Sequence, residues 1–236
     1  MMNNTKMDVN TYDLTHVLFH GMPVYWTEEN FHLNVVRNIP KDHYEARYLE
    51  IETHNGTHMD APRHIIENGR GIDSYSFYNF TGNAIVINLT DKGSYTDITQ
   101  REIFPEDLEN YEEQIKLSDI IILNTGWSRI RGITNEYMFR WPYLDVSGAK
   151  YLSKFKLKMI CIDAPSIAGN VRENESIDVI ETHKVLLQND ILITEELNLN
   201  YDIFKRKDVI KGYFVALPLK ILDGDGSPTR AFLTIK

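Results

Sequence analysis

A short stretch near residue 60 gathers side chains that could bind a metal ion or transfer a proton. It reads His54-Asn-Gly-Thr-His-Met-Asp-Ala-Pro-Arg-His64 and holds three of the eight histidines of the chain. Its chemically active residues and its two backbone-shaping residues all occupy even positions: His54, Gly56, His58, Asp60, Pro62 and His64. Side chains alternate along an extended chain, so a strand would direct these residues to one side, whereas a helix would scatter them. The glycine, the proline and the neighbouring β-branched threonines also argue against a helix.

Two imidazoles and a carboxylate form a ligand set that suits a divalent first-row metal, zinc first, with manganese or iron close behind. A straight strand would separate His54 from His58 by about 13 Å, the limit that two histidines can span to one ion. It would separate His58 from Asp60 by only about 7 Å. If both histidines bind one ion, the chain must therefore bend near Gly56, where glycine permits unusual dihedral angles. The alternative is a polar surface strand with solvated histidines, and the convergence of several ligands favours the metal site.

The elements that must position this stretch can be read from hydrophobic periodicity. Leu49, Ile51 and Thr53 alternate with two glutamates, which predicts a strand with one face in the core that runs into the loop carrying the cluster. Further strands are expected at residues 11–18, 84–89, 119–123, 159–162, 191–194, 214–219 and 231–235. Helices are expected at residues 103–110, with Pro105 near the start, at 147–154, with Ser147 as a cap, and at 176–187. Strands outnumber helices, so the expected class is mixed α/β, with a flexible tail at residues 1–10 and a single domain at 11–236.

Composition restricts the function classes. The 236 residues suit one sizeable domain, and the net charge of −9 without a long basic run argues against nucleic acid or an anionic membrane as partner. The single cysteine, Cys161, excludes an internal disulfide framework, and it lies in an apolar run as expected of a buried thiol in a reducing cytosol. No stretch is long and apolar enough to cross a membrane, so we expect a cytoplasmic protein.

The run His54-x-Gly56-Thr57-His58-x-Asp60-x-Pro62-x-His64 resembles the HxGTHxDxPxH signature of the cyclase superfamily of metal-dependent hydrolases, which includes bacterial kynurenine formamidases and isatin hydrolases. Other segments resemble the family as well, so the resemblance covers most of the chain. They are His20-Gly-Met-Pro-Val-Tyr-Trp26, Leu123-Asn-Thr-Gly-Trp127, Ile162-Asp-Ala-Pro-Ser166, His183 with Glu195, and Asp225-Gly-Ser-Pro-x-Arg230-Ala. The resemblance implies a swivelling β/β/α architecture around a central mixed sheet.

The resemblance also implies roles for residues whose local sequence is ambiguous. His183 late in a helix and Glu195 at a strand end would ordinarily be structural. In the family they match the positions that, with Asp60, complete a second metal site beside the one held by His54, His58 and Asp60. Glu195 is preferred to its neighbour because Glu-x-Leu matches the family spacing.

Two further assignments are expected by resemblance. His64 would be the general base or acid, and the alternative is that it orients a metal ligand. Trp26 would line the pocket of an aromatic substrate, although it could as easily pack under the core.

The activity implied is metal-assisted hydrolysis of the carbon–nitrogen bond of a small-molecule amide, with one or two zinc or manganese ions. An aryl formamide such as N-formylkynurenine is the first candidate substrate, and a cyclic amide such as isatin is the second. A metal-binding module without catalysis is the alternative from another class. By resemblance, we also expect a homodimer or a higher homo-oligomer.

Overall fold

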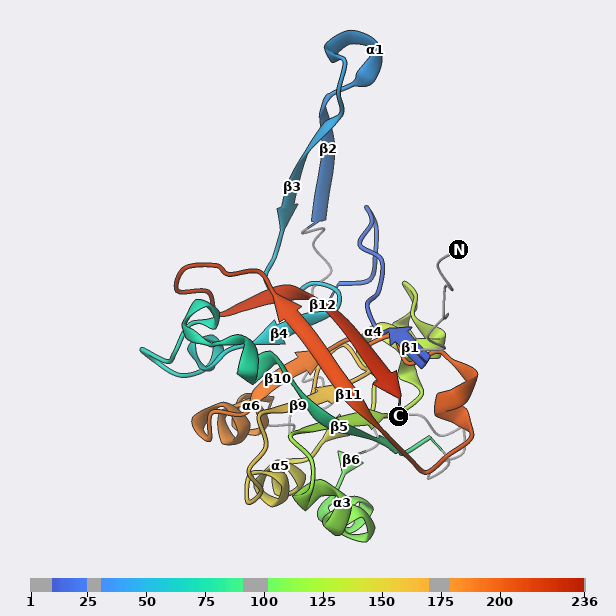
Figure 1. Cartoon of the computed structure of the whole chain (residues 1–236), viewed down its shortest axis with the longest axis vertical. Coiled ribbons are helices and arrows are strands. Elements are labelled where there is room, and N and C mark those ends of the chain that lie inside the picture. Colours follow the sequence, from blue (N-terminus) through green and yellow to red (C-terminus); the bar gives the residue numbers. More distant parts are fainter. Residues whose placement is uncertain (1–9, 25–30, 91–101, 170–178, 236) are drawn as a thin grey trace, which may run out of the picture.

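Seven strands pair edge to edge until the last meets the first, and they form a closed mixed sheet (Figure 1). The computed structural model describes residues 10–24, 31–90, 102–169 and 179–235. In spatial order the strands are β12 (Gly226–Ile235), β11 (Val209–Pro218), β5 (Thr81–Asn88), β7 (Ile120–Asn124), β9 (Met159–Ile162), β10 (Leu192–Glu195) and β4 (His58–Asp60). The pairings β5–β7, β7–β9 and β9–β10 are parallel, and those that involve β4, β11 or β12 are antiparallel. The pairing of β4 with both β10 and β12 closes the ring.

Two hydrophobic cores lie on the two faces of this sheet. On β7, Ile120 and Ile122 belong to the core inside the ring, whereas Ile121 and Leu123 belong to the core beneath the helices. The same alternation holds along β5 and β9. A strand that is covered on both faces has no polar side, which explains the continuous apolar runs at residues 84–87, 120–123 and 159–162.

The longer helices pack on the outer face of the parallel strands (Figure 1). The helices are α1 (Ile39–Asp42), α2 (Pro105–Leu108), α3 (Glu112–Lys116), α4 (Asn135–Phe139), α5 (Val146–Leu152) and α6 (Val179–Gln188). Buried side chains of α2, α3, α5 and α6 fill the outer core. A two-stranded parallel sheet of β6 (Glu102–Ile103) and β8 (Tyr143–Leu144) lies on this side. Among the described helices, none combines the length and the apolar character needed to cross a membrane.

A hairpin arm projects from the ring along the longest axis of the molecule (Figure 1). It consists of β2 (Phe31–Arg37) and β3 (Ala46–Ile51), with α1 at its tip. The prediction that Leu49 and Ile51 face the core is wrong for Leu49, which is 49% exposed, and Ile51 is only partly buried. Thr53, the third residue of that pattern, is also only partly buried. The alternation of apolar residues identified the strand but not what lies against it.

The mixed α/β class is confirmed, and the swivelling β/β/α name stays a prediction. The strand expected at 11–18 is β1 (Asn10–Asp13), which pairs with β12 and ends where the Asp13 carboxylate accepts a hydrogen bond from the Thr15 N–H. Asn10, assigned to the tail, is already in this strand, and residues 1–9 lie outside the described part.

The helical predictions hold only in part. Of the helix expected at 103–110, only Pro105–Leu108 (α2) is α-helical, because Ile103 belongs to β6 and a 3₁₀ turn occupies Glu109–Tyr111. The helix α3 that follows was not predicted. The cap of α5 is Asp145 rather than Ser147, since the Asp145 carboxylate accepts the Ser147 N–H. Residues 176–178 of the helix expected at 176–187 lie outside the described residues. Cys161 is buried as expected, and the cytosolic location inferred from it stays a prediction.

Candidate metal centre

The shortest strand of the ring positions the centre of the site. β4 is buried along its whole length and lies between β10 and β12. Its pairing sets Glu195 opposite His58 and Gly226 opposite Asp60. Met59 points into the inner core, so His58 and Asp60 point to the other face, toward the helices.

A tight turn at Gly56 brings His54 back to this strand. Gly56 has a φ of +67°, and a Cβ atom there would lie 2.6 Å from a methyl group of Leu18. Thr57 fixes the turn, because its hydroxyl donates to the Glu196 carbonyl at 2.7 Å and accepts the His16 N–H at 2.9 Å. The bend near Gly56 is therefore present as expected. One uninterrupted extended face from residue 54 to 64 is not present, since Pro62–His64 form a 3₁₀ turn.

The structure brings the five predicted metal ligands and His64 together. The donor atoms form two sets, and within each set all of them lie within 4.8 Å of one another. One set comes from His54, Asp60 and His64, and the other from His58, Asp60 and Glu195. His183, which comes from α6, places Nε2 at 3.3 Å from Glu195 Oε1 and 3.8 Å from Asp60 Oδ2. Asp60 belongs to both sets, but the sets differ from the predicted ones, because His64 accompanies His54 and Glu195 accompanies His58. The bridging role of Asp60 stays a prediction.

The donor set fits a metal ion. Within the described part of the chain, the buried Oδ2 atom of Asp60 has no hydrogen-bond partner. A carboxylate that is 1% exposed and has an unpaired oxygen is costly unless a cation lies nearby. Imidazole nitrogens and carboxylate oxygens are the ligands that zinc and manganese accept.

Charge in the cluster also favours a cation. Burial would lower the pKa of His58, but hydrogen bonds to Asp60 and Glu195 raise it well above its usual value. Burial likewise opposes protonation of His54, yet hydrogen bonds to Asp225 and Asp60 raise its pKa to about 9. Burial and the charge of Asp60 would raise the pKa of Glu195, but His183 and His58 hold it at about 2. Without a metal the carboxylates are ionised, and protons on the histidines supply the balancing charge.

Glu195 and Glu196 point in different directions, which supports the choice of Glu195 for the cluster. The Glu195 Oε1 atom accepts a hydrogen bond of 2.6 Å from the Ile167 N–H. Glu196 instead accepts from Arg131 Nε at 2.8 Å and from the Tyr137 hydroxyl at 2.7 Å.

His64 lies beside the cluster. Its ring is tilted by 35° over that of His54 at a centroid distance of 4.0 Å, and its Nδ1 atom is 3.8 Å from Asp225 Oδ2. Burial lowers the pKa of His64 below its usual value. The ring is therefore neutral near pH 7 and able to accept a proton.

The other polar residues of the family-like segments have structural contacts. Asp163 is buried, accepts hydrogen bonds from the Thr125 N–H and hydroxyl, and holds the turn after β7. Ser227 is buried, and its hydroxyl accepts the Leu219 N–H and donates to the Pro228 carbonyl. Arg230 is an exposed ion-pair partner of Asp13. Trp26 lies outside the described residues, so its predicted role stays a prediction.

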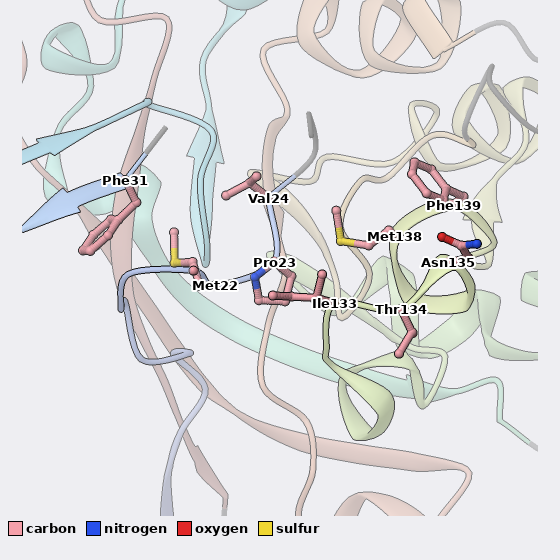
Figure 2. A pocket seen from close by; sticks show the side chains of 10 residues that line it. Met22, Pro23, Val24, Phe31, Ile133, Thr134, Asn135, Met138 and Phe139 are labelled. Atoms are coloured by element: carbon pink, nitrogen blue, oxygen red, sulfur yellow. The ribbon is translucent and has the colours of Figure 1, made fainter. Parts of the chain in front are cut away.

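One cavity adjoins the cluster, and no cluster residue lines a second one. The first, of about 260 Å³, is lined by four histidines and Glu195 together with Glu52, Ile65, Pro165, Ser166 and Ile180. The second, of about 290 Å³, is apolar, with Met22, Pro23 and Val24 on one side and Ile133, Met138 and Phe139 on the other (Figure 2). A smaller cavity borders both, since it shares Pro23, Val24 and Met138 with the second and His54 and Pro165 with the first.

Sequence reasoning did not assign a role to Asp225, although the closing family-like segment begins with it. Its Oδ2 atom lies 2.9 Å from His54 Nε2, and its Oδ1 atom accepts the Thr53 hydroxyl at 3.1 Å. A Cβ atom on the next residue, Gly226, would lie 2.7 Å from His54 Cε1. In the sequence, only the family-like segment that begins with Asp225 pointed to this residue, because 171 positions separate it from His54.

A closed sheet that carries a histidine- and carboxylate-rich centre on its shortest strand, β4, defines the class of protein. The family model described as "Putative cyclase" matches residues 12–168, so the chain belongs to the cyclase family.

The relatives agree with this assignment. The chain is 25% identical over 235 residues to a protein named kynurenine formamidase from Erythrobacter litoralis, an alignment that covers 98% of this chain and 97% of that protein. A Bacillus mycoides protein of the same name is 28% identical over 187 residues, which is 78% of each chain. Among solved structures, isatin hydrolase A from Labrenzia aggregata has the same fold, with a TM-score of 0.80 at 20% identity over 96% of this chain and 94% of that one.

Proposed function

We propose that the protein is a metal-dependent hydrolase of the carbon–nitrogen bond of a small amide, with an aryl formamide such as N-formylkynurenine as substrate. The observation that carries the proposal is the buried cluster around Asp60, whose Oδ2 atom has no hydrogen-bond partner in the described part of the chain. The cluster opens into a cavity of about 260 Å³, near the lower end of the usual ligand range of ~300–1,000 Å³. A cavity of that size suits a substrate with a single aromatic ring rather than a polymer.

The ligands proposed for the metal are His54, His58, Asp60, His183 and Glu195, and we propose zinc, with manganese as the alternative, and one or two ions. When bound, such an ion lowers the pKa of a water molecule and polarises the amide carbonyl. Asp60 belongs to both groups of donor atoms, which supports its role as a shared ligand.

The proposed work of the remaining side chains is to move a proton and to hold the substrate. His64 is neutral near pH 7, and we assign Nε2, the nitrogen that does not face Asp225, as the base that takes the proton from water. The same nitrogen then delivers the proton to the leaving amine. Ile65, Pro165 and Ile180 form the apolar wall for the aryl group.

Metal analysis and an assay on one purified sample test this proposal. We expect the protein to contain a divalent metal, to hydrolyse N-formylkynurenine, and to lose both metal and activity in the His58→Ala variant. Full metal content in His58→Ala would contradict the ligand assignment. An active enzyme that opens isatin but leaves formamides intact would favour the cyclic amide, which the fold shared with isatin hydrolase A supports. Metal without activity on either class would favour a non-catalytic binding module.

We further propose that the protein is a homo-oligomer assembled through the hairpin arm. A two-stranded hairpin is at best marginally stable in water, so an apolar projecting one needs a partner surface. Large apolar side chains of the arm are exposed: Leu33, Val35, Val36, Ile39, Tyr44, Tyr48 and Leu49. Light scattering should give at least a dimer mass for the native chain and a smaller mass for Val35→Glu. Leu117→Glu is the matched control, because Leu117 is 79% exposed and lies away from the arm. A monomeric native protein would contradict the proposal.

A further inference from the structure

The two histidines that flank Gly56 do not offer the same ring nitrogen to the cluster. His58 donates a hydrogen bond from Nδ1 to the Gly56 carbonyl at 2.8 Å, since a carbonyl oxygen can only accept. Its Nε2 atom is left to face Asp60 Oδ1 at 3.4 Å and Glu195 Oε2 at 3.2 Å.

His54 has the opposite arrangement. Its Nε2 atom lies 2.9 Å from Asp225 Oδ2, and its Nδ1 atom lies 2.8 Å from Asp60 Oδ1. A carboxylate is an acceptor, so Nε2–H donates to Asp225 in the neutral tautomer, and the Nδ1 lone pair faces the cluster. Without a cation, a proton on Nδ1 makes the 2.8 Å contact a hydrogen bond to Asp60. With a cation bound, the Nδ1 lone pair and the Asp60 oxygen would both be directed at it.

We propose that Asp225 is a positioning residue that selects the Nδ1 face of His54 for the metal, so that His54 and His58 present opposite ring nitrogens. The inference rests on the proposed metal site and goes beyond it by assigning the ligand atoms and the residue that fixes them. Nδ1 lies closer to the backbone than Nε2, so its use suits a histidine that a tight turn has brought back against β4.

Asp225 is itself held in place from two sides. The Thr53 hydroxyl donates to Oδ1 at 3.1 Å, and the Ala61 N–H donates to the Asp225 carbonyl at 2.9 Å. His64 Nδ1 is 3.8 Å from the same Oδ2 atom that binds His54, beyond hydrogen-bond range. Loss of the carboxylate therefore acts first on the orientation of His54.

The test compares the native protein with Asp225→Asn, Thr53→Val and the control Asp223→Asn. Asp223 lies two residues from Asp225 and is an exposed partner of Arg63 at 3.0 Å, so its amide variant should behave as native. The metal dissociation constant, measured by competition with a chromogenic chelator, should rise roughly 10- to 100-fold in Asp225→Asn and by a smaller factor in Thr53→Val. An affinity of Asp225→Asn within twofold of native would overturn the proposal.

A second measurement identifies the ligand atoms without any assay of activity. In protein loaded with ¹¹³Cd, a histidine bound through Nδ1 couples to the metal through Hε1 alone, whereas one bound through Nε2 couples through both Hε1 and Hδ2. We expect the first pattern for His54 and the second for His58. If His54 and His58 both showed the Nε2 pattern, the inference would be overturned and the hydrolase proposal would be unaffected. Failure of the native protein to bind any divalent metal would end the hydrolase proposal itself.

Discussion

Replacing Gly226 by alanine should disable the metal centre while leaving most of the fold intact. A Cβ atom at this position would lie 2.7 Å from His54 Cε1, 2.8 Å from the Met59 carbonyl oxygen and 3.2 Å from His54 Nδ1. Carbon atoms in contact lie ~3.5–4.0 Å apart, so the His54 ring would have to retreat by roughly 0.8 Å, the difference between 3.5 and 2.7 Å. The Met59 carbonyl belongs to β4 and cannot retreat without weakening the β4–β12 pairing.

A displacement of this size exceeds what a metal site tolerates, because ligand distances are defined to about 0.2 Å. A misplacement of about 1 Å can lower the rate about 10²-fold. We therefore expect kcat/KM of Gly226→Ala to fall by about that factor and its metal affinity to fall at least about tenfold.

The assay combines metal competition, initial rates on the aryl formamide and thermal unfolding. Gly132→Ala is the matched control, since the atom nearest to its added Cβ lies at 3.7 Å, an ordinary contact. Native affinity and native rate in Gly226→Ala would refute the reasoning, because they would mean that His54 can move without consequence.

Three other outcomes are expected. His64→Asn should lower kcat by about 10²–10⁴-fold at unchanged metal content, and a loss of metal instead would make His64 a ligand. Metal affinity should rise with pH until about 9, because the raised pKa of His54 makes binding release a proton; a pH-independent dissociation constant between pH 6 and 8 would contradict this. Burial, and then the charge of Arg131, lower the pKa of His16 from 6.5 to about 3. The unfolded chain therefore takes up a proton at His16 that the folded chain does not, and stability falls as pH drops below 6.5, by at most about 2 kcal/mol at pH 5. Urea unfolding of the metal-free protein should show a shallower decline for His16→Gln, and parallel curves would count against the assignment.

The strands of the parallel half of the sheet could be predicted from sequence for a physical reason. β7 and β9 are buried on both faces, so residues 120–123 and 159–162 are unbroken apolar runs. The bend at Gly56 could also be predicted, because a straight strand would separate two histidines four residues apart by about 13 Å, the limit for binding one ion.

The arm and the contact of Asp225 could not be predicted in the same way. The alternation of apolar residues in β3 predicts a strand with one covered face. It does not tell whether that face is covered by the core of the same chain or by another surface. Asp225 approaches His54 because β12 pairs with β4, two strands that are far apart in the sequence. A pairing of that kind leaves no local trace in the sequence.

The position of β12 in the chain has a consequence for synthesis. A ribosome makes every other strand of the ring first, together with all six clustered residues, and makes β12 last. Until that strand leaves the exit tunnel, the ring stays open, β4 has a free edge, and His54 lacks Asp225 and Gly226 beside it. Capture of the ion in its final geometry is therefore expected only after β12 has left the ribosome, and a nascent chain stalled before residue 225 should be inactive and prone to pair with other strands.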